Sequence, residues 1–146
     1  MKNKTDWGEV LVSGFGYDSG LQNANAHQTS YISPPCKGDG LVHRASGQHT
    51  IQIHTINFSG NIAIWATMDK DPNSGAYLPV QLTDTQTGNV STSLSYVYPV
   101  NGTGTQGSGK TVQINKFYTA IGQYAWLYAN ISGVKGGFVD SIKIAF

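Results

Sequence analysis

Charged helix-forming residues are almost missing from this chain, and that shortage restricts its fold more than any other feature. The 146 residues include one glutamate, Glu9, and one arginine, Arg44. A surface helix normally uses Glu, Lys and Arg, because they lose little rotamer freedom there and form pairs one turn apart. The polar residues here are mainly Ser, Thr, Asn, Gln and Gly, which total 63, and many of these favour turns. The composition predicts an all-β protein.

Short alternating segments separated by turn residues are the second sign of this class. Apolar residues recur at every second position, as in strands with one buried face, and Gly, Pro, Asn and Asp gather between the segments. About eight strands at such spacing predict an antiparallel β-sandwich or jelly roll. The expected strands cover residues 9–13, 41–45, 50–58, 62–69, 77–82, 91–100, 110–117, 124–131 and 138–146, and residues 59–61 and 71–75 are expected to be turns.

Two of these strands contain a change of phase. Within residues 50–58 the apolar positions shift between Ile53 and Ile56, which predicts a β-bulge near Thr55. The last strand slips in the same way at Asp140–Ser141. Without such slips, half of the apolar side chains in each strand would face solvent.

The first forty residues differ from the rest in composition. After residues 9–13 they are dense in Gly, Asn, Ser and Pro, and Pro34–Pro35 restricts two successive backbone angles. We therefore expect an extended N-terminal arm over residues 1–40 and a β-sandwich domain over residues 41–146. The arm has too many apolar side chains for a linker, so we expect it to contact the domain or a neighbouring chain. The interface residues expected are Phe15, Tyr17, Leu21, Tyr31 and Ile32.

Charge and cysteine content argue against several classes of protein. Nine Lys and Arg against eight Asp and Glu leave a net charge of +1, without the basic stripe that nucleic-acid binding needs. No stretch approaches the roughly 18 apolar residues of a membrane span, and the start of the chain lacks the apolar run of a signal peptide. The single cysteine, Cys36, excludes an internal disulfide and a Cys-based zinc cluster.

One match to a catalytic motif is judged by its surroundings. Residues 104–111 read GTQGSGKT and match the P-loop, in which Lys110 and Thr111 would contact phosphate and magnesium. That motif requires a following helix, whereas the next residues, VQINKF, alternate like a strand, so we interpret the match as a hairpin connection. No G-x-S-x-G motif occurs, and Cys36, next to two prolines, has no local base to activate it. We expect no enzyme activity and no cofactor.

The histidines and acids form no metal motif. The chain has four histidines, His27, His43, His49 and His54, without close ligand spacing. His49 and His54 are expected on opposite faces of one strand. Asp69, Asp71 and Asn73 offer oxygen ligands at alternate positions, as a calcium loop does, but turn formation is the favoured interpretation. No metal site is predicted.

Aromatic side chains offer the remaining candidate site. Four of them lie in or beside late strands and suit a platform that stacks on sugars: Trp65, Tyr77, Trp126 and Tyr128. Aromatic residues also fill sandwich cores and subunit interfaces, which is the simpler interpretation. The phase of Trp65 and Trp126 separates these alternatives. Inward rings belong to a core, and a ring exposed beside polar neighbours favours sugar binding.

Two segments, residues 56–82 and 116–146, together show a recognisable pattern of strands and turns. The features are a turn at 67–69, an aromatic-led strand at 77–80, a Gly-x-Tyr-Ala-Trp-Leu strand at 122–127, a glycine-containing turn at 133–137 and a final strand at 141–146. This pair resembles small accessory virion proteins of tailed bacteriophages.

The resemblance implies a non-enzymatic structural protein that assembles on the virion as a decoration or cement protein, or as a neck or tail connector. It implies a homo-oligomer, made in the host cytoplasm, whose partners are the major capsid, neck or tail proteins. Composition argues against nucleic-acid and membrane partners. The alternative is a lectin-like carbohydrate-binding module of a phage adhesin or fibre.

Overall fold

The computed structural model describes residues 8–17, 28–38, 47–98 and 111–145, and every regular element in these ranges is a β-strand. The all-β class is therefore confirmed. None of the described segments forms a helix that could cross a membrane. The strands are β1 (Gly8–Gly16), β2 (Tyr31–Ile32), β3 (Cys36–Lys37), β4 (Gln48–Thr67), β5 (Leu78–Pro79), β6 (Leu82–Asp84), β7 (Val90–Ser91), β8 (Leu94–Tyr96), β9 (Gln113–Ile121) and β10 (Trp126–Ala145).

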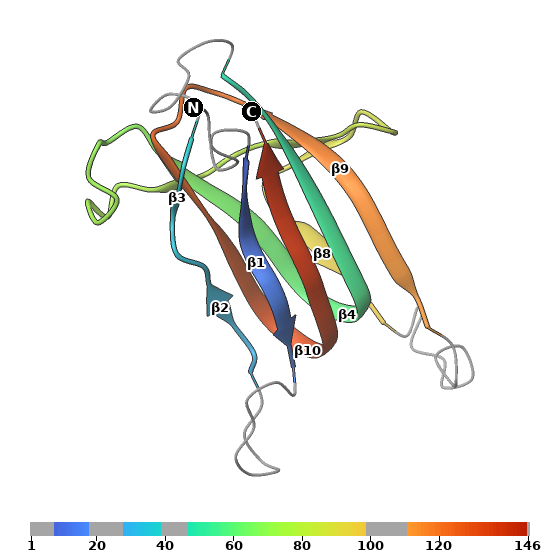
Figure 1. Cartoon of the computed structure of the whole chain (residues 1–146). Helices are drawn as coiled ribbons and strands as arrows, with labels where there is room; N and C mark the ends of the chain where they lie inside the picture. The colour runs from blue at the N-terminus through green and yellow to red at the C-terminus, as the bar shows by residue number, and fades with distance from the viewer. Residues whose placement is uncertain (1–7, 18–27, 39–46, 99–110, 146) are drawn as a thin grey trace, which may run out of the picture.

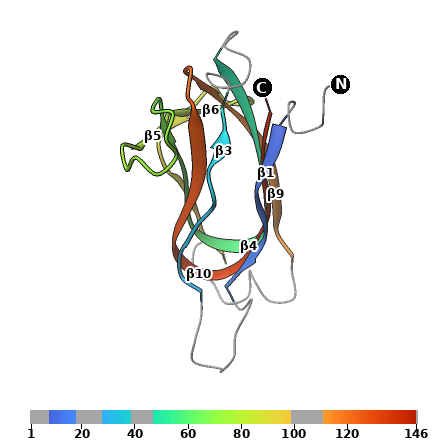
Figure 2. The same cartoon turned by 60° about the vertical axis from the view of Figure 1, so that its left-hand side comes forward.

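Two long strands organise the whole sheet. β4 and β10 each have 20 residues and pair antiparallel from end to end. Both bend sharply at their middles, and Figure 2 shows the resulting U. The sheet thus folds over on itself, and its two halves face each other as the layers of an antiparallel β-sandwich.

We name the two layers after the parts of β4 and β10 that they contain. The first half-sheet holds residues 48–56 and 138–145, flanked by β1 on one side and by β9, β6 and β7 on the other. The second half-sheet holds residues 60–67 and 126–132, flanked by β2 and β3 on one side and by β5 and β8 on the other (Figure 1).

The bend is produced by unequal numbers of residues on the two strands. Ile56 pairs with Phe138 and Ser59 with Gly136, so Asn57 and Phe58 together oppose Gly137. Asn57 has a φ of 51° and Gly137 a φ of 82°, values that side chains rarely adopt. The bulge expected near Thr55 thus lies later in β4, at Asn57 and Phe58, because Thr55 is buried in phase with Ile53 and Ile56 is only half-buried.

A second bulge is confirmed where the last strand was expected to slip. The register steps from Val139–Thr55 directly to Ser141–His54, which leaves Asp140 without an opposite residue. The slip lets Val139 and Ile142 both point into the core although they are three residues apart.

The turn expected at residues 59–61 is wrong, as is the one expected at residues 133–137. Both segments lie inside strands, in β4 and β10 respectively. Gly and Asn suit a turn and a bend equally well, because both need unusual backbone angles or close backbone approach. A Cβ on Gly60 would lie 2.8 Å from the ring of Phe58, so the bend itself requires glycine there.

The core lies between the two half-sheets and is filled mainly by β-branched residues. The most buried side chains are Ile51, Ile53, Ile62, Ile64, Leu82, Leu127, Ile131, Ile142, Ile144, His49, Val139 and Thr55. Their alternation along β4 and β10 is the pattern that predicted the strands.

The described part of residues 1–40 belongs to the same sheet and core. β1 pairs with β10 along residues 138–145 and buries Leu11, Val12 and Phe15. β2 and β3 pair with the other half of β10. The described part of this segment is thus held against the rest of the chain by strand pairing.

Candidate functional site

The outer surface of the second half-sheet carries a cluster of aromatic rings, which we call the aromatic face: Trp65, Tyr77, Trp126 and Tyr128. Trp65 pairs directly with Tyr128 across β4 and β10. Their rings are 6.3 Å apart and nearly parallel, at 7°. Tyr77 adds a third ring 4.8 Å from that of Tyr128, tilted by 57°. These four residues, proposed from the sequence as one set, do lie together.

The loop after β4 holds the edge of this face in place. The indole Nε1 of Trp126 donates a hydrogen bond to the carbonyl of Lys70 at 2.9 Å. The hydroxyl of Tyr77 donates to the carbonyl of Pro72 at 2.8 Å. Both polar ends of these aromatic side chains are therefore satisfied, and their rings are oriented without help from a ligand.

The phase of the two tryptophans resolves one alternative left open by the sequence. Trp65 lies between the buried residues Ile64 and Ala66, so its ring points outward and is half-buried. Trp126 precedes the fully buried Leu127 and is half-buried on the same outer surface. Neither ring belongs to the sandwich core. An interface or a ligand surface is favoured instead.

The acidic segment after β4, residues 69–75, forms a turn, as the sequence predicted. A side-chain oxygen of Asp71 accepts the backbone N–H of Asn73 at 2.9 Å, and Gly75 has a φ of 79°. The hydroxyl of Thr67 accepts the N–H of Asp69 at 3.1 Å. Within the described ranges, no three His, Cys, Asp or Glu side chains gather as a metal site would require.

The outer surface of the first half-sheet carries a polar cluster beside exposed apolar side chains such as Phe117 and Val10. We call this cluster the polar face: Gln52, His54, Gln113, Asn115 and Asp140. The two ring nitrogens of His54 contact Asp140 and Gln113, each at 3.1 Å. Gln52 donates to Asn115 at 3.0 Å. The polar face is thus a ladder of side chains bonded to one another across three strands.

The two described histidines lie on opposite faces of β4, as expected. His49 is fully buried, and its Nδ1 lies 3.1 Å from the carbonyl of Gly47. His54 lies outward on the polar face. His27 and His43 lie outside the described residues.

The residues proposed as an interface arm divide into buried and exposed ones. Phe15 is buried and its ring stacks on Tyr31 at 5.6 Å. Tyr17 packs half-buried against the core. Ile32 is exposed on β2, at 60% of its surface, and Leu21 lies outside the described residues.

Cys36 and the P-loop match have no catalytic setting in the described chain. Cys36 is buried, and burial, with a smaller effect of Glu9, raises the pKa of its thiol to about 12. A protonated, buried thiol is a poor nucleophile. Of the P-loop match only Thr111 is described, and it is followed by β9, a strand where the motif requires a helix.

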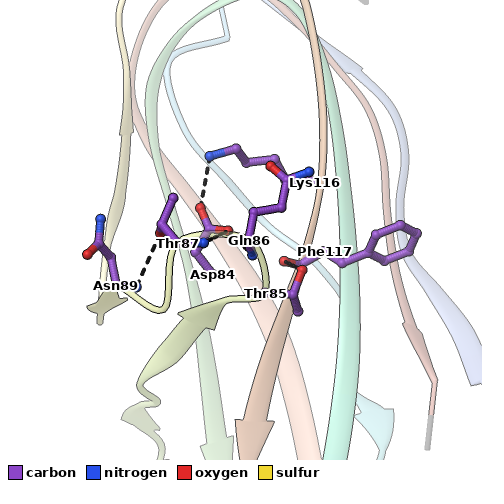
Figure 3. Close-up of polar contacts among 7 residues, drawn as sticks. All are labelled: Asp84, Thr85, Gln86, Thr87, Asn89, Lys116 and Phe117. Carbon is purple, nitrogen blue, oxygen red and sulfur yellow. Dashed lines mark hydrogen bonds and ion pairs between the residues drawn. The ribbon is translucent and has the colours of Figure 1, made fainter.

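The structure adds a polar site that the sequence did not reveal, centred on Lys116. β9 places Lys116 opposite the buried Ile53, so the lysine starts from the inner face of the first half-sheet. Its ammonium donates to a carboxylate oxygen of Asp84 at 2.8 Å, whereas Phe117 points the other way (Figure 3). The sequence held one sign of this inward position: Lys116 alternates along β9 with Ile114 and Tyr118, so the three side chains share one face of the strand.

Asp84 is held by several donors at the end of β6. One carboxylate oxygen accepts the backbone N–H groups of Gln86, at 2.8 Å, and Thr87, at 3.3 Å. The other accepts the Lys116 ammonium. The hydrogen bond from Lys116, followed by that from Gln86, lowers the pKa of Asp84 to about 2. The carboxylate is therefore charged at every ordinary pH.

A pocket of about 400 Å³ opens beside this ion pair, between the β8 edge of one half-sheet and β9 of the other. It is lined by Ser91, Ser93, Leu94, Ser95, Tyr96, Ile114, Lys116 and Tyr118. The hydroxyl of Tyr96 is buried and has no hydrogen-bond partner of good geometry in the described chain. Burial, followed by the neighbouring Tyr118, raises its pKa. An unpartnered buried hydroxyl costs about 1–3 kcal/mol.

Comparisons with known proteins relate this chain to others through its fold alone. No protein-family model and no curated protein sequence matches it. One solved structure, the SPBc2 prophage-derived protein YomS, superposes on 90% of this chain and 88% of its own, with a TM-score of 0.51 and 10% sequence identity. The chain therefore shares its folded-sheet architecture with a prophage-derived protein.

Proposed function

We propose that this chain is a non-enzymatic structural protein of a bacteriophage particle, acting as a decoration or cement protein or as a neck or tail connector. The observation that carries the proposal is the aromatic face. Outward Trp and Tyr rings, held in place on two paired strands, are typical of the anchor residues of protein interfaces. The fold shared with a prophage-derived protein supports the phage setting.

The aromatic face suits a protein partner for a physical reason. Its rings are already ordered by neighbouring rings and by the carbonyls of Lys70 and Pro72. Binding therefore costs little side-chain entropy, while it removes aromatic surface from water. The partners we propose are the major capsid, neck or tail proteins, together with further copies of this chain.

The test combines solution mass with particle binding. Light scattering of the purified chain should give a homo-oligomer, or co-sedimentation with candidate virions should saturate at a fixed copy number. Trp65→Ala and Tyr128→Ala should each weaken assembly about tenfold or more. His54→Ala, on the polar face, is the matched control and should assemble normally. A monomer that ignores every particle would contradict the proposal.

A lectin-like module is the second candidate, and the outward position of Trp65 and Trp126 favours it over a purely structural packing role. A sugar ring would stack on the exposed aromatic surface. A glycan array should then give selective binding that Trp65→Ala removes. Binding to particles stripped of glycans would instead support the structural role.

A further inference from the structure

We propose that the pocket between β8 and β9 binds a neutral, hydroxyl-rich small molecule, of the size of one sugar residue. This inference does not rest on the particle role proposed above. It also concerns a different surface from the aromatic face, since the pocket opens between the two layers, at β8 and β9, whereas the aromatic rings lie on the outer surface of β4 and β10.

The size of the pocket agrees with a ligand of this class. Small-molecule sites span roughly 300 to 1,000 Å³, and this pocket, at about 400 Å³, lies near the lower end. It sits where the two layers separate, between Ser95 of β8 and Lys116 of β9. Both strands are held by β4, through Asn61 and Ile53 respectively, so the walls are already formed.

The charges of the pocket favour a neutral ligand. Lys116 is the one ionisable side chain in the lining that is charged at neutral pH, and Asp84 neutralises it at 2.8 Å. A carboxylate or phosphate would have to compete with Asp84 for the ammonium. A hydroxyl group can accept from the remaining N–H groups of Lys116 while the ion pair stays intact.

The other lining groups match a molecule with both hydroxyl and C–H surfaces. Ser93 carries a hydroxyl that can donate and accept. Tyr96 contributes a buried hydroxyl that lacks a hydrogen-bond partner of good geometry, with Tyr118 beside it, and an entering acceptor would satisfy it. Leu94 and Ile114 supply the apolar wall against which the C–H faces of a sugar ring pack.

The test is a titration of the full chain with single sugars, followed by ¹H–¹⁵N NMR. Glucose, galactose and N-acetylglucosamine are the neutral probes, and glucuronate is the charged comparison. At least one neutral sugar should give saturable shifts centred on β8 and β9. Glucuronate should bind more weakly than glucose.

Three variants locate the binding. Ser93→Trp fills the rim from an exposed position and should weaken binding about tenfold or more. Tyr96→Phe removes the hydroxyl alone and should weaken it about three- to tenfold, the range of one hydrogen bond. Gln52→Ala, on the polar face, is the control and should bind as the wild type does. Thermal unfolding checks that each variant folds.

Three results would overturn the proposal. One is the absence of saturable shifts with every neutral sugar up to tens of millimolar. Another is tighter binding of glucuronate than of glucose. The third is loss of binding in Trp65→Ala with full binding in Ser93→Trp, which would place the sugar on the aromatic face. Particle co-sedimentation is measured separately, so either proposal can fail alone.

Discussion

The polar face and the aromatic face are built on the same two strands, before and after one bend. Their inner rows are alike, with Ile51 and Ile53 in one half of β4 and Ile62 and Ile64 in the other, all fully buried. Their outer rows differ in that the aromatic rings of one pack on each other, whereas the other has a bonded polar cluster beside exposed apolar side chains such as Phe117. The comparison teaches that the inner rows specify the fold, whereas the outer rows are free to carry function.

The two faces also differ in what a partner could gain from them. On the polar face, His54 and Gln52 already bond to neighbouring side chains, so a partner would have to replace contacts that exist. On the aromatic face, the rings of Trp65 and Tyr128 expose apolar surface whose removal from water is favourable. The aromatic face is therefore the better candidate for binding.

The largest expected effect comes from removing the bend that separates the faces. A Cβ on Gly137 would lie 2.0 Å from the carbonyl oxygen of Asn57, and φ is 82° there. We expect Gly137→Ala to destabilise the fold by about 3 kcal/mol or more, measured by urea unfolding. Gly136→Ala is the matched control, because a Cβ there meets no atom within 4 Å. Equal stabilities would show that the bend tolerates a side chain.

The next largest effect is a difference in stability between substitutions of inward and outward side chains on β10. Leu127 is fully buried, so Leu127→Ala should cost about 2–5 kcal/mol. Tyr128 lies outward, so Tyr128→Ala should cost about 1–3 kcal/mol, the scale of its two aromatic pairs with Trp65 and Tyr77. Trp126→Ala should resemble Tyr128→Ala. A large loss for the outer residues would mean that the aromatic face is structural and not reserved for binding.

Acid should weaken the first half-sheet through Asp84. Its pKa in the folded chain is lowered to about 2, below the unfolded value of about 3.9. The stabilisation is therefore complete above about pH 4 and is lost as the pH falls toward 2. Asp84→Asn should flatten the pH dependence of the thermal midpoint in that window. An unchanged acid transition in this variant would remove Asp84 as its cause.

The smallest effect is expected on the polar face itself. His54→Ala and Gln52→Ala should each change stability by only about 0.5 kcal/mol, as is usual for surface substitutions. Both variants should keep normal assembly. Loss of particle binding in either one, with an unchanged thermal midpoint, would reverse the functional ranking of the two faces.

Alternation and phase predicted much of this architecture, including most of the inner rows and the slip at Asp140, but they placed the bulge of β4 near Thr55 instead of at Asn57 and Phe58. They failed where the same residues serve two purposes. Ser59, Gly60 and Asn61 suit a turn as well as a bend, and the outcome depends on pairing with β10, far along the chain.

The candidate sites were likewise predictable from the sequence only in part. The four aromatic residues could be named from their strands, although only the structure shows that they share an outer surface. The pocket could not be predicted, because its ion pair joins Lys116 to Asp84, 32 residues earlier. Such a contact depends on the layer geometry and leaves no local pattern in the sequence.

The central place of β10 has a consequence for how the chain acquires its fold. β10 lies between β1 and β4 in the sheet, yet it follows every other strand in chain order. Each β4–β10 pair, from Thr67–Trp126 to Thr50–Ala145, closes a long loop, which makes folding slow. During synthesis, β1 and β4 must wait with unpaired edges until β10 emerges. The nascent chain is then most exposed to self-association.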